Sequence, residues 1–190
     1  MQQHIIDQII RSRRSVYPEM YEQQGIADDL IDTILENANW APNHRLTEPW
    51  RFKIFKNESL KVLADFLGDA YKLQNDENSF SEMKHKKIVE KVLKSACVIA
   101  VCFQRDPEQR VPEEEELLAM GAAIQNMWLT CSSYGIGCYL STPSAIRNIS
   151  KIVHLAEGER CVGLFYMGWA KENELKSQRT PVSEKIVRVS

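Results

Sequence analysis

The chain has 190 residues, of which 44% are hydrophobic and 26% are charged, and its formal net charge is -2. This length allows one sizeable domain, and the composition excludes a chain that is disordered throughout. The small net charge gives no reason to expect a nucleic-acid partner, and we expect neither a membrane-spanning segment nor a signal peptide.

The first half of the chain alternates between helical and extended patterns. Isoleucines at helical spacing predict a helix over residues 3–13. Asp28 is a candidate N-cap of a second helix. The aromatic, alternating stretch Trp50–Phe55 predicts a strand, and residues 58–75 predict a third helix. The charged residues 76–94 carry only a weak helical stripe, so we expect a mobile flap that covers a site.

The second half contains longer apolar runs. Cys97–Phe103 is apolar throughout, as in a strand buried on both faces. An acidic run opens a helix from Glu113 to about Tyr134, and the interior of this helix has almost no polar face. Because a helix that is apolar all round has to be buried all round, it is either a central core helix or a helix shared with a second subunit. We favour the shared helix.

The last elements follow two glycines, Gly135 and Gly137, that end the long helix. They are a short strand at Cys138–Ser141, a helix from Pro143 or Ser144 to about Leu155, a strand at Cys161–Trp169, and a charged tail with a short element near its end. Strands and helices intermix along the whole chain, which predicts an α+β fold in a single domain of residues 1–190, with one central sheet and helices packed over it.

The cysteines and histidines give no sign of a metal site. The five cysteines form no CxxC pair and lie in apolar stretches, where a thiol behaves as a small hydrophobe. The four histidines are scattered without ligand spacing. We therefore expect no metal, no disulfide framework and a reducing, cytoplasmic location. The cysteines are Cys97, Cys102, Cys131, Cys138 and Cys161.

Motifs for phosphate cradles and for serine hydrolases are absent from the sequence, which has no GxGxxG, P-loop or GxSxG pattern. What remains is a set of cationic and polar groups near chain turns. Arg13, Arg14 and Ser15 could clamp a phosphate or a flavin edge. Taken alone, they are better explained as cations that offset the negative end of a helix.

Three further groups have equally plain alternatives. His44 lies in a loop between two prolines and could donate to a ligand oxygen, or have no role; nearby Trp50 is expected in the core. Leu140, Ser141 and Thr142 could meet an anion or a ring carbonyl, although helix capping explains their hydroxyls as well. Near the end of the chain, a basic group could bind phosphate or form a solvated tail. Its members are Lys176 and Arg179, followed by Pro181.

Four segments, in this order and spacing, resemble the short-chain branch of the nitroreductase family. They are Arg13–Ser15, then WAPNHRLTEPWRF at Trp40–Phe52, then MGAAIQNMWLTCSSYGIG at Met120–Gly137, and VGLFYMGWA at Val162–Ala170. The second segment is the most specific, since a helix that ends in Ala-Pro, a polar loop and a Pro-Trp that enters a strand mark the family. Together, the segments extend the resemblance over nearly the whole chain.

The resemblance implies a three-layer α+β sandwich with a mainly antiparallel sheet. It also implies a homodimer joined through long central helices, with FMN held non-covalently at the interface. By position, a first set of residues matches contacts to the FMN phosphate and ribityl chain, namely Arg13, Arg14, Ser15 and Arg179, with Lys176 as a weaker candidate. A second set matches contacts nearer the flavin ring, namely His44, Leu140, Ser141 and Thr142, with Trp40 reaching it from the partner subunit.

The sequence also departs from the family pattern. Leu46 and Thr47 stand where many members carry an asparagine, and Glu48 replaces the common glutamine. A Trp-Arg pair of some short-branch relatives is Leu140-Ser141 here. These differences bear on the flavin-edge contacts and on substrate preference.

The implied activity is a ping-pong transfer of hydride from NAD(P)H, through flavin N5, to a small electron-poor acceptor such as a nitroaromatic or a quinone. The cofactor carries the chemistry, so no catalytic side chain or covalent nucleophile is expected. Three alternatives remain: a specialised flavin reaction such as dehalogenation or flavin breakdown, a flavin-binding protein without turnover, and a structural module without flavin.

Overall fold

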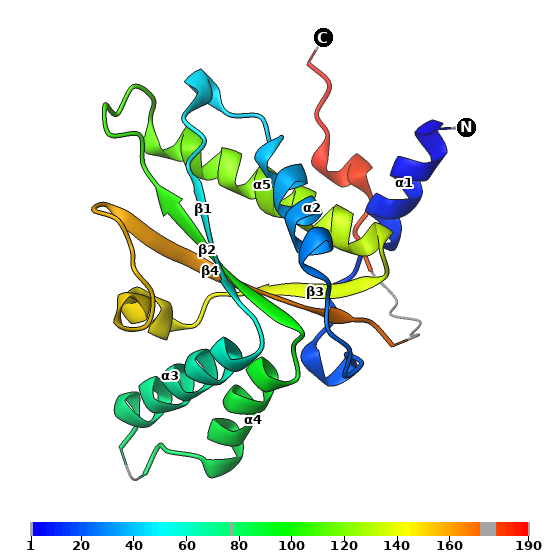
Figure 1. Cartoon of the computed structure of the whole chain (residues 1–190). Helices are drawn as coiled ribbons and strands as arrows, with labels where there is room; N and C mark the ends of the chain where they lie inside the picture. The colour runs from blue at the N-terminus through cyan, green and yellow to red at the C-terminus, as the bar shows by residue number, and fades with distance from the viewer. Residues whose placement is uncertain (1, 77, 172–177, 190) are drawn as a thin grey trace.

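The computed structural model describes residues 2–76, 78–171 and 178–189. Its centre is a four-stranded antiparallel sheet in the order β1-β2-β4-β3 (Figure 1). The strands are β1 (Trp50–Phe55), β2 (Cys97–Gln104), β3 (Ile136–Ser141) and β4 (Glu159–Trp169). β2 lies between two strands and is buried along almost its whole length, as its unbroken apolar run predicted.

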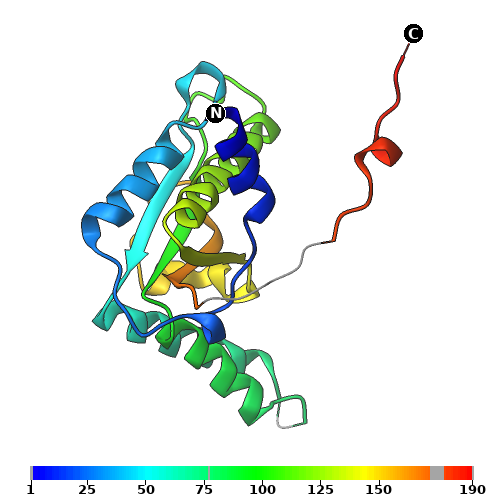
Figure 2. The ribbon, with the colours of Figure 1, turned by 90° about the vertical axis from the view of Figure 1, so that its right-hand side faces the viewer.

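Helices cover both faces of the sheet (Figures 1 and 2). One layer contains α1 (Gln2–Ser12), α2 (Asp28–Asn39) and α5 (Glu113–Ser133). The other contains α3 (Glu58–Gln74), α4 (Glu82–Leu93) and the 3-10 helix η3 (Ser144–Lys151). Alternate residues of each strand enter the two cores, so that Ile99 and Phe165 pack toward α2 and α5 while Val98 and Tyr166 pack toward α3 and α4. The predicted α+β three-layer sandwich is confirmed.

The segment that follows α1 is held along the free edge of β3. Ser15 forms a parallel bridge with Cys138, and the Val16 amide donates to the Cys138 carbonyl at 3.1 Å. The Tyr21 ring lies over two glycines that face each other in β3 and β4: a Cβ added at Gly137 or Gly168 would lie 3.0 Å or 2.5 Å from this ring. Glycine is required at both positions because any Cβ atom there would occupy the space of the Tyr21 ring.

Several local expectations are corrected. Asp28 does not cap α2, because Ala27 holds the N-cap position in extended conformation, and the Asp28 carboxylate pairs with Lys56 at 2.6 Å. The helix expected to reach Leu155 ends at Lys151 as a 3-10 helix that is interrupted at Asn148. Residues 82–93 form a regular helix, α4, in agreement with the helical stripe noted in residues 76–94, and Glu77 lies outside the described residues.

Close packing joins α4 to α3. Val92 is fully buried, and a Cβ added at Gly68 would lie 2.9 Å from His85 and 3.0 Å from Val89. The two helices therefore form a hairpin whose α4 arm is anchored in the core. Whether residues 69–94 also act as a lid stays a prediction.

α5 ends as the sequence predicted, with Tyr134 as its C-cap and Gly135 at a φ of 75°. It is not buried all round, however. Leu118 is 75% exposed, and Leu117 and Gln125 on the same helix are also exposed.

A short 3-10 helix, η4 (Val182–Lys185), lies in the tail, where residues 178–189 extend away from the sheet and its helices (Figure 2). In the described part of the chain, no helix is long and apolar enough to cross a membrane.

Candidate functional site

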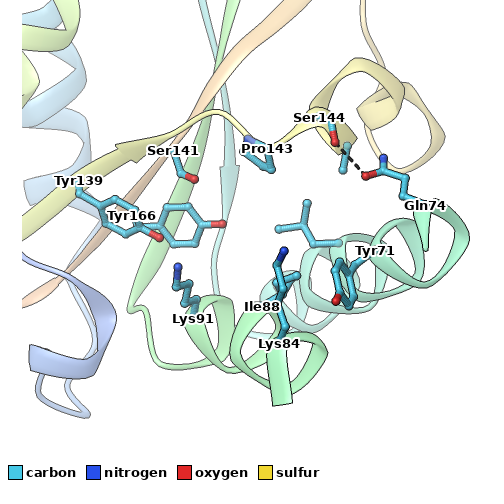
Figure 3. A pocket seen from close by; sticks show the side chains of 12 residues that line it. Tyr71, Gln74, Lys84, Ile88, Lys91, Tyr139, Ser141, Pro143, Ser144 and Tyr166 are labelled. Atoms are coloured by element: carbon cyan, nitrogen blue, oxygen red, sulfur yellow. Dashed lines mark hydrogen bonds between the residues drawn. The ribbon is translucent and has the colours of Figure 1, made fainter. Parts of the chain in front are cut away.

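A cavity of about 320 Å³ lies between the sheet and the α3–α4 hairpin (Figure 3). Three parts of the fold line it: the inward side of β3 and β4, the turn between β3 and η3, and the facing sides of α3 and α4. Its volume lies at the lower end of the range found for small-molecule sites. The lining residues are Leu67, Tyr71, Gln74, Lys84, Ile88, Lys91, Tyr139, Ser141, Pro143, Ser144, Ala145 and Tyr166.

Tyrosines form the sheet side of the cavity. The rings of Tyr139 and Tyr166 are stacked, with centroids 4.8 Å apart, and Tyr17 packs on Tyr139 at 4.9 Å. Burial raises the pKa of both Tyr139 and Tyr166 above the ordinary value, so both phenols are neutral at physiological pH. This wall offers a flat ring an aromatic surface without negative charge.

The helical side of the cavity carries positive charge. Lys84, Ile88 and Lys91 lie on one side of α4, and the amino groups of both lysines point into the cavity (Figure 3). The Lys84 ammonium lies 5.3 Å from the centre of the Tyr71 ring. At the far end, Ser144 donates to Gln74 at 3.0 Å. The cavity therefore combines an aromatic wall, two cations and few neutral polar groups, a combination suited to a planar ligand that bears or acquires negative charge.

A second cavity, of about 350 Å³, lies where α1, the C-terminal end of α5 and the start of β3 meet. Arg14, Trp128 and Gly135 are among its lining residues. The Arg13 guanidinium lies 4.8 Å from the centre of the Trp128 ring, and Trp128 Nε1 is buried with no hydrogen-bond partner among the described residues. The Arg14 guanidinium, with Arg13 close by, gives this cavity donors for an anion.

The two cavities lie along the same edge strand, and this places part of the predicted set together. Ser15 lies beside the middle of β3, with Arg13 and Arg14 toward the second cavity, and Ser141 at the end of β3 lines the first. Arg14 donates to the carbonyls of Arg11 at 2.6 Å and Arg13 at 2.9 Å. Thr142 is exposed beside the first cavity but lines a neighbouring groove.

Leu140 faces the opposite side of the sheet from Ser141. It packs with the core beneath α5, and its Cδ1 would lie 2.8 Å from a Cβ added at Gly163. Its side chain is therefore no part of the first cavity. Trp50 is buried, as expected, and donates to Asn39 at 2.9 Å.

His44 lies far from Arg13, and neither His44 nor Trp40 lines either cavity of its own chain. His44 Nδ1 is 2.6 Å from a Glu115 carboxylate oxygen in the first turn of α5, whereas Arg13 lies over Trp128, thirteen residues later. At a helical rise of 1.5 Å per residue this separation is about 20 Å. Trp40 is 79% exposed and donates to Glu36.

Arg179 is exposed in the tail, where it donates to the Gln178 carbonyl at 2.7 Å, and Lys176 lies outside the described residues.

The sequence did not predict the tyrosines that form the sheet side of the first cavity or the two lysines of α4. Lys84, Ile88 and Lys91 follow each other at four- and three-residue spacing, which places them on one side of a helix. The sequence could therefore predict that these side chains share one side of a helix. It could not predict that they face β3 and β4, because that placement depends on the tertiary fold. No metal-binding cluster of His, Cys, Asp or Glu occurs within residues 2–76, 78–171 and 178–189.

Comparison with known proteins identifies relatives along nearly the full chain. The sequence model of the nitroreductase family matches residues 10–169. YfhC of Bacillus subtilis, a protein assigned as an NAD(P)H nitroreductase, is 27% identical and covers 99% of this chain and 96% of its own length. The iodotyrosine deiodinase of Hydra vulgaris is 25% identical and covers 94% of this chain, which spans 71% of that protein.

Solved structures show the same fold. A nitroreductase-like protein from Bacillus cereus superposes with a TM-score of 0.80 and 28% identity, covering 97% of this chain and 95% of its own. The FMN-dependent nitroreductase NfnB of Mycobacterium smegmatis, solved in complex with NADPH, has a TM-score of 0.78 at 14% identity and covers 100% of both chains.

Proposed function

Because the chain belongs to the nitroreductase family, we propose that it is an FMN-dependent oxidoreductase that transfers hydride from NAD(P)H to small electron-poor acceptors such as nitroaromatics or quinones. One observation carries the proposal: a segment of two arginines and a serine and a tyrosine-walled, lysine-bearing cavity lie along the same edge strand, β3. The donor and the acceptor occupy this cavity in turn, as a ping-pong reaction requires.

The residues of the two cavities fit FMN. The phosphate of FMN needs charge-assisted donors, which Arg13, Arg14 and Ser15 supply beside the second cavity. FMN, when bound, supplies the ring that accepts and releases hydride.

Each of the flanking residues has a separate task. The segment Leu140–Thr142 lies at the ring end through its backbone and the Ser141 and Thr142 hydroxyls. Lys91 and Lys84 offset negative charge that develops in the first cavity. The stacked phenols of Tyr139 and Tyr166 stay neutral and exclude water. None of these groups has to form a covalent bond or exchange a proton with the protein.

The same proposal includes a homodimer. Leu117 and Leu118 leave an apolar face of α5 exposed, as do Ile5 and Ile6 on α1, and such a face is covered in a stable assembly. Because His44 lies about 20 Å along the helix from Arg13, and neither His44 nor Trp40 lines a cavity of its own chain, both contact FMN from the second copy. Arg179 joins the phosphate site from the tail. Residues 1–190 then act as one FMN-binding unit.

Dehalogenation is a second candidate reaction, and the likeness to the Hydra vulgaris deiodinase favours it. Release of halide from a halogenated aromatic, with consumption of NAD(P)H, would select it over reduction of nitro groups or quinones. A flavin-binding protein without turnover would show neither. We also propose a cytoplasmic location, because all five cysteines are free thiols.

The test is the flavin content of purified protein and its response to the electron donor. Wild type carries a flavin absorption band that bleaches on anaerobic addition of NADH or NADPH. Arg14→Ala loses most of the bound FMN. Arg51→Ala is the matched control, because Arg51 also donates to nearby carbonyls, those of Glu48 and Trp50, but lies away from both cavities. A wild-type protein that takes up no FMN, or an Arg14→Ala variant with unchanged flavin content, would overturn the assignment.

A further inference from the structure

Two cysteines face each other across the centre of the sheet, beside the site already described. Cys102 on β2 pairs directly with Cys161 on β4 in the antiparallel register. The register shifts between Val101 and Cys102, where Val101 pairs with Gly163, so Val162 is the extra residue of a β-bulge. Without that extra residue, Cys102 would face Val162, whose side chain points to the other face of the sheet. The bulge therefore brings the two thiols to the same face.

The spacing of directly opposed residues suits a covalent bond between them. Antiparallel partners have Cα atoms about 4.5–5.5 Å apart, and disulfides span about 4.4–6.8 Å between Cα atoms. Both side chains belong to the core on the α3 side of the sheet. The usual spacing of directly opposed strand residues therefore lies within the range that a disulfide spans.

The two thiols differ in their exposure to solvent and in the direction of their pKa shifts. Cys102 is fully buried, whereas Cys161 is partly exposed in a groove of about 550 Å³ that is also lined by two cations, Arg147 and Arg160, and by the carboxylate of Glu159. A hydrogen bond from the Cys102 thiol, aided by the backbone of Gly163, lowers the pKa of Cys161, although burial and the negative charge of Glu159 oppose it. The same hydrogen bond, with burial, raises the pKa of Cys102. Cys161 is thus the thiolate-forming, accessible member of the pair.

We propose that Cys161 is a peroxide-reactive thiol and that Cys102 resolves its oxidised form as a disulfide between β2 and β4. The Cys161 thiolate attacks one peroxide oxygen, the O–O bond breaks, and a sulfenic acid and one water form after protonation. The Cys102 sulfur then bonds to the Cys161 sulfur and the S–O bond breaks, so that the Cys102 proton leaves with the hydroxyl as a second water. Two thiols are oxidised and one hydroperoxide is reduced.

A second cysteine pair shows what the site requires. Cys131 on α5 hydrogen-bonds Cys138 on β3, but both are buried, Cys138 is only 1% exposed, and burial raises the pKa of Cys138. Contact alone therefore does not make a reactive pair. Cys102 and Cys161 combine contact with an opening to solvent and with a lowered thiol pKa. Because this inference rests on the cysteines only, it holds whether or not the proposed flavin function is correct.

The test uses the full-length protein, reduced and then freed of reductant, with hydrogen peroxide at a few-fold molar excess. Thiols counted after denaturation fall by two from the five of the reduced chain, and peptide mapping without reductant finds Cys102 joined to Cys161. In Cys102→Ser, Cys161 stops at the sulfenic acid and is trapped by a dimedone probe. Cys161→Ser keeps its four remaining thiols over the same time.

Two outcomes would refute the proposal. One is an undiminished count of five thiols in the wild-type protein under conditions that oxidise a free cysteine in solution. The other is thiol loss that peptide mapping assigns to other cysteines. Since both are read from the wild-type chain, neither depends on the folding of a variant. A disulfide between two chains, visible as a dimer on a non-reducing gel, would also contradict the assigned pair.

Discussion

The hydroxyl of Tyr21 links the N-terminal segment to the sheet, and its removal tests whether that link positions Arg13–Ser15. Tyr21 is only 2% exposed, and its hydroxyl lies 2.9 Å from the Val16 carbonyl and 3.2 Å from the Tyr166 carbonyl. One O–H has a single proton for these two acceptors, so Tyr21→Phe removes about one hydrogen bond. Burial also raises the pKa of Tyr21, so the phenol donates throughout the physiological range.

The expected cost is about 1–2 kcal/mol of unfolding free energy, because a buried carbonyl loses its donor while the less polar phenylalanine is easier to bury. With a urea m-value of roughly 1–3 kcal/mol/M, the unfolding midpoint falls by about 0.3–2 M. The flavin content of the variant also falls, since the Val16 carbonyl is one residue from Ser15 and loses its anchor. Tryptophan fluorescence in a urea series, at one protein concentration, measures the first effect.

Tyr17→Phe is the matched control. Tyr17 is 49% exposed, and the phenylalanine ring keeps the contact with Tyr139. Its free energy of unfolding should therefore stay within about 0.5 kcal/mol of the wild-type value, as for most surface changes. Equal midpoints for Tyr21→Phe and Tyr17→Phe would refute the reasoning, because the two-acceptor hydrogen bond would then contribute nothing. A midpoint that falls without loss of flavin would separate stability from positioning.

Two further predictions concern a buried ion pair and the exposed helix face. Burial raises the pKa of Glu159, but hydrogen bonds from the Ala156 amide and Lys53 outweigh it, so the net pKa is lowered. This stabilisation is present above the unfolded pKa of about 4.3 and is lost as the pH falls through the folded value. Lys53→Met should therefore cost about 1.5–3 kcal/mol at neutral pH, and a gap from wild type that does not narrow in acid urea titrations would contradict it. Leu118→Asp should convert a dimer to monomer in light-scattering chromatography while Leu73→Asp, on a side chain 84% exposed on α3, does not; a dimeric Leu118→Asp protein would place the subunit contact elsewhere.

Much of the fold was predictable because its strongest patterns are local. The unbroken apolar run of β2 predicted a strand buried on both faces. Gly135 predicted the end of α5, because glycine readily adopts the left-handed φ that often follows a helix, and the structure has this φ there. The predicted N-cap of α2 was wrong because the Asp28 carboxylate forms an ion pair with Lys56, which lies 28 residues further along the chain. Rules for capping consider only neighbouring residues and therefore cannot predict this partner. Tertiary contacts of this kind decide between equally acceptable caps.

The candidate site divides in the same way. Arg13, Arg14 and Ser15 could be found because they are adjacent in sequence and match a family motif. Lys91 and Tyr139 could not, because they come together only when α4 packs against the end of β3, nearly 50 residues further along the chain. The pattern on α4 predicts which side chains share a face, but not which surface that face meets.

The apolar surface of α5 connects the fold to the proposed site. Full burial of a leucine side chain contributes about 1.5–3 kcal/mol, so Leu118, exposed in the single chain, leaves that free energy available to a partner. A second copy packed on α5 would cover this surface. It would also allow Trp40 and His44 to reach the FMN site from the partner chain, because neither lines a cavity of its own chain and His44 lies about 20 Å along the helix from Arg13. On this reasoning the dimer completes the FMN site, and a variant that separates the subunits should lose flavin while it keeps its fold.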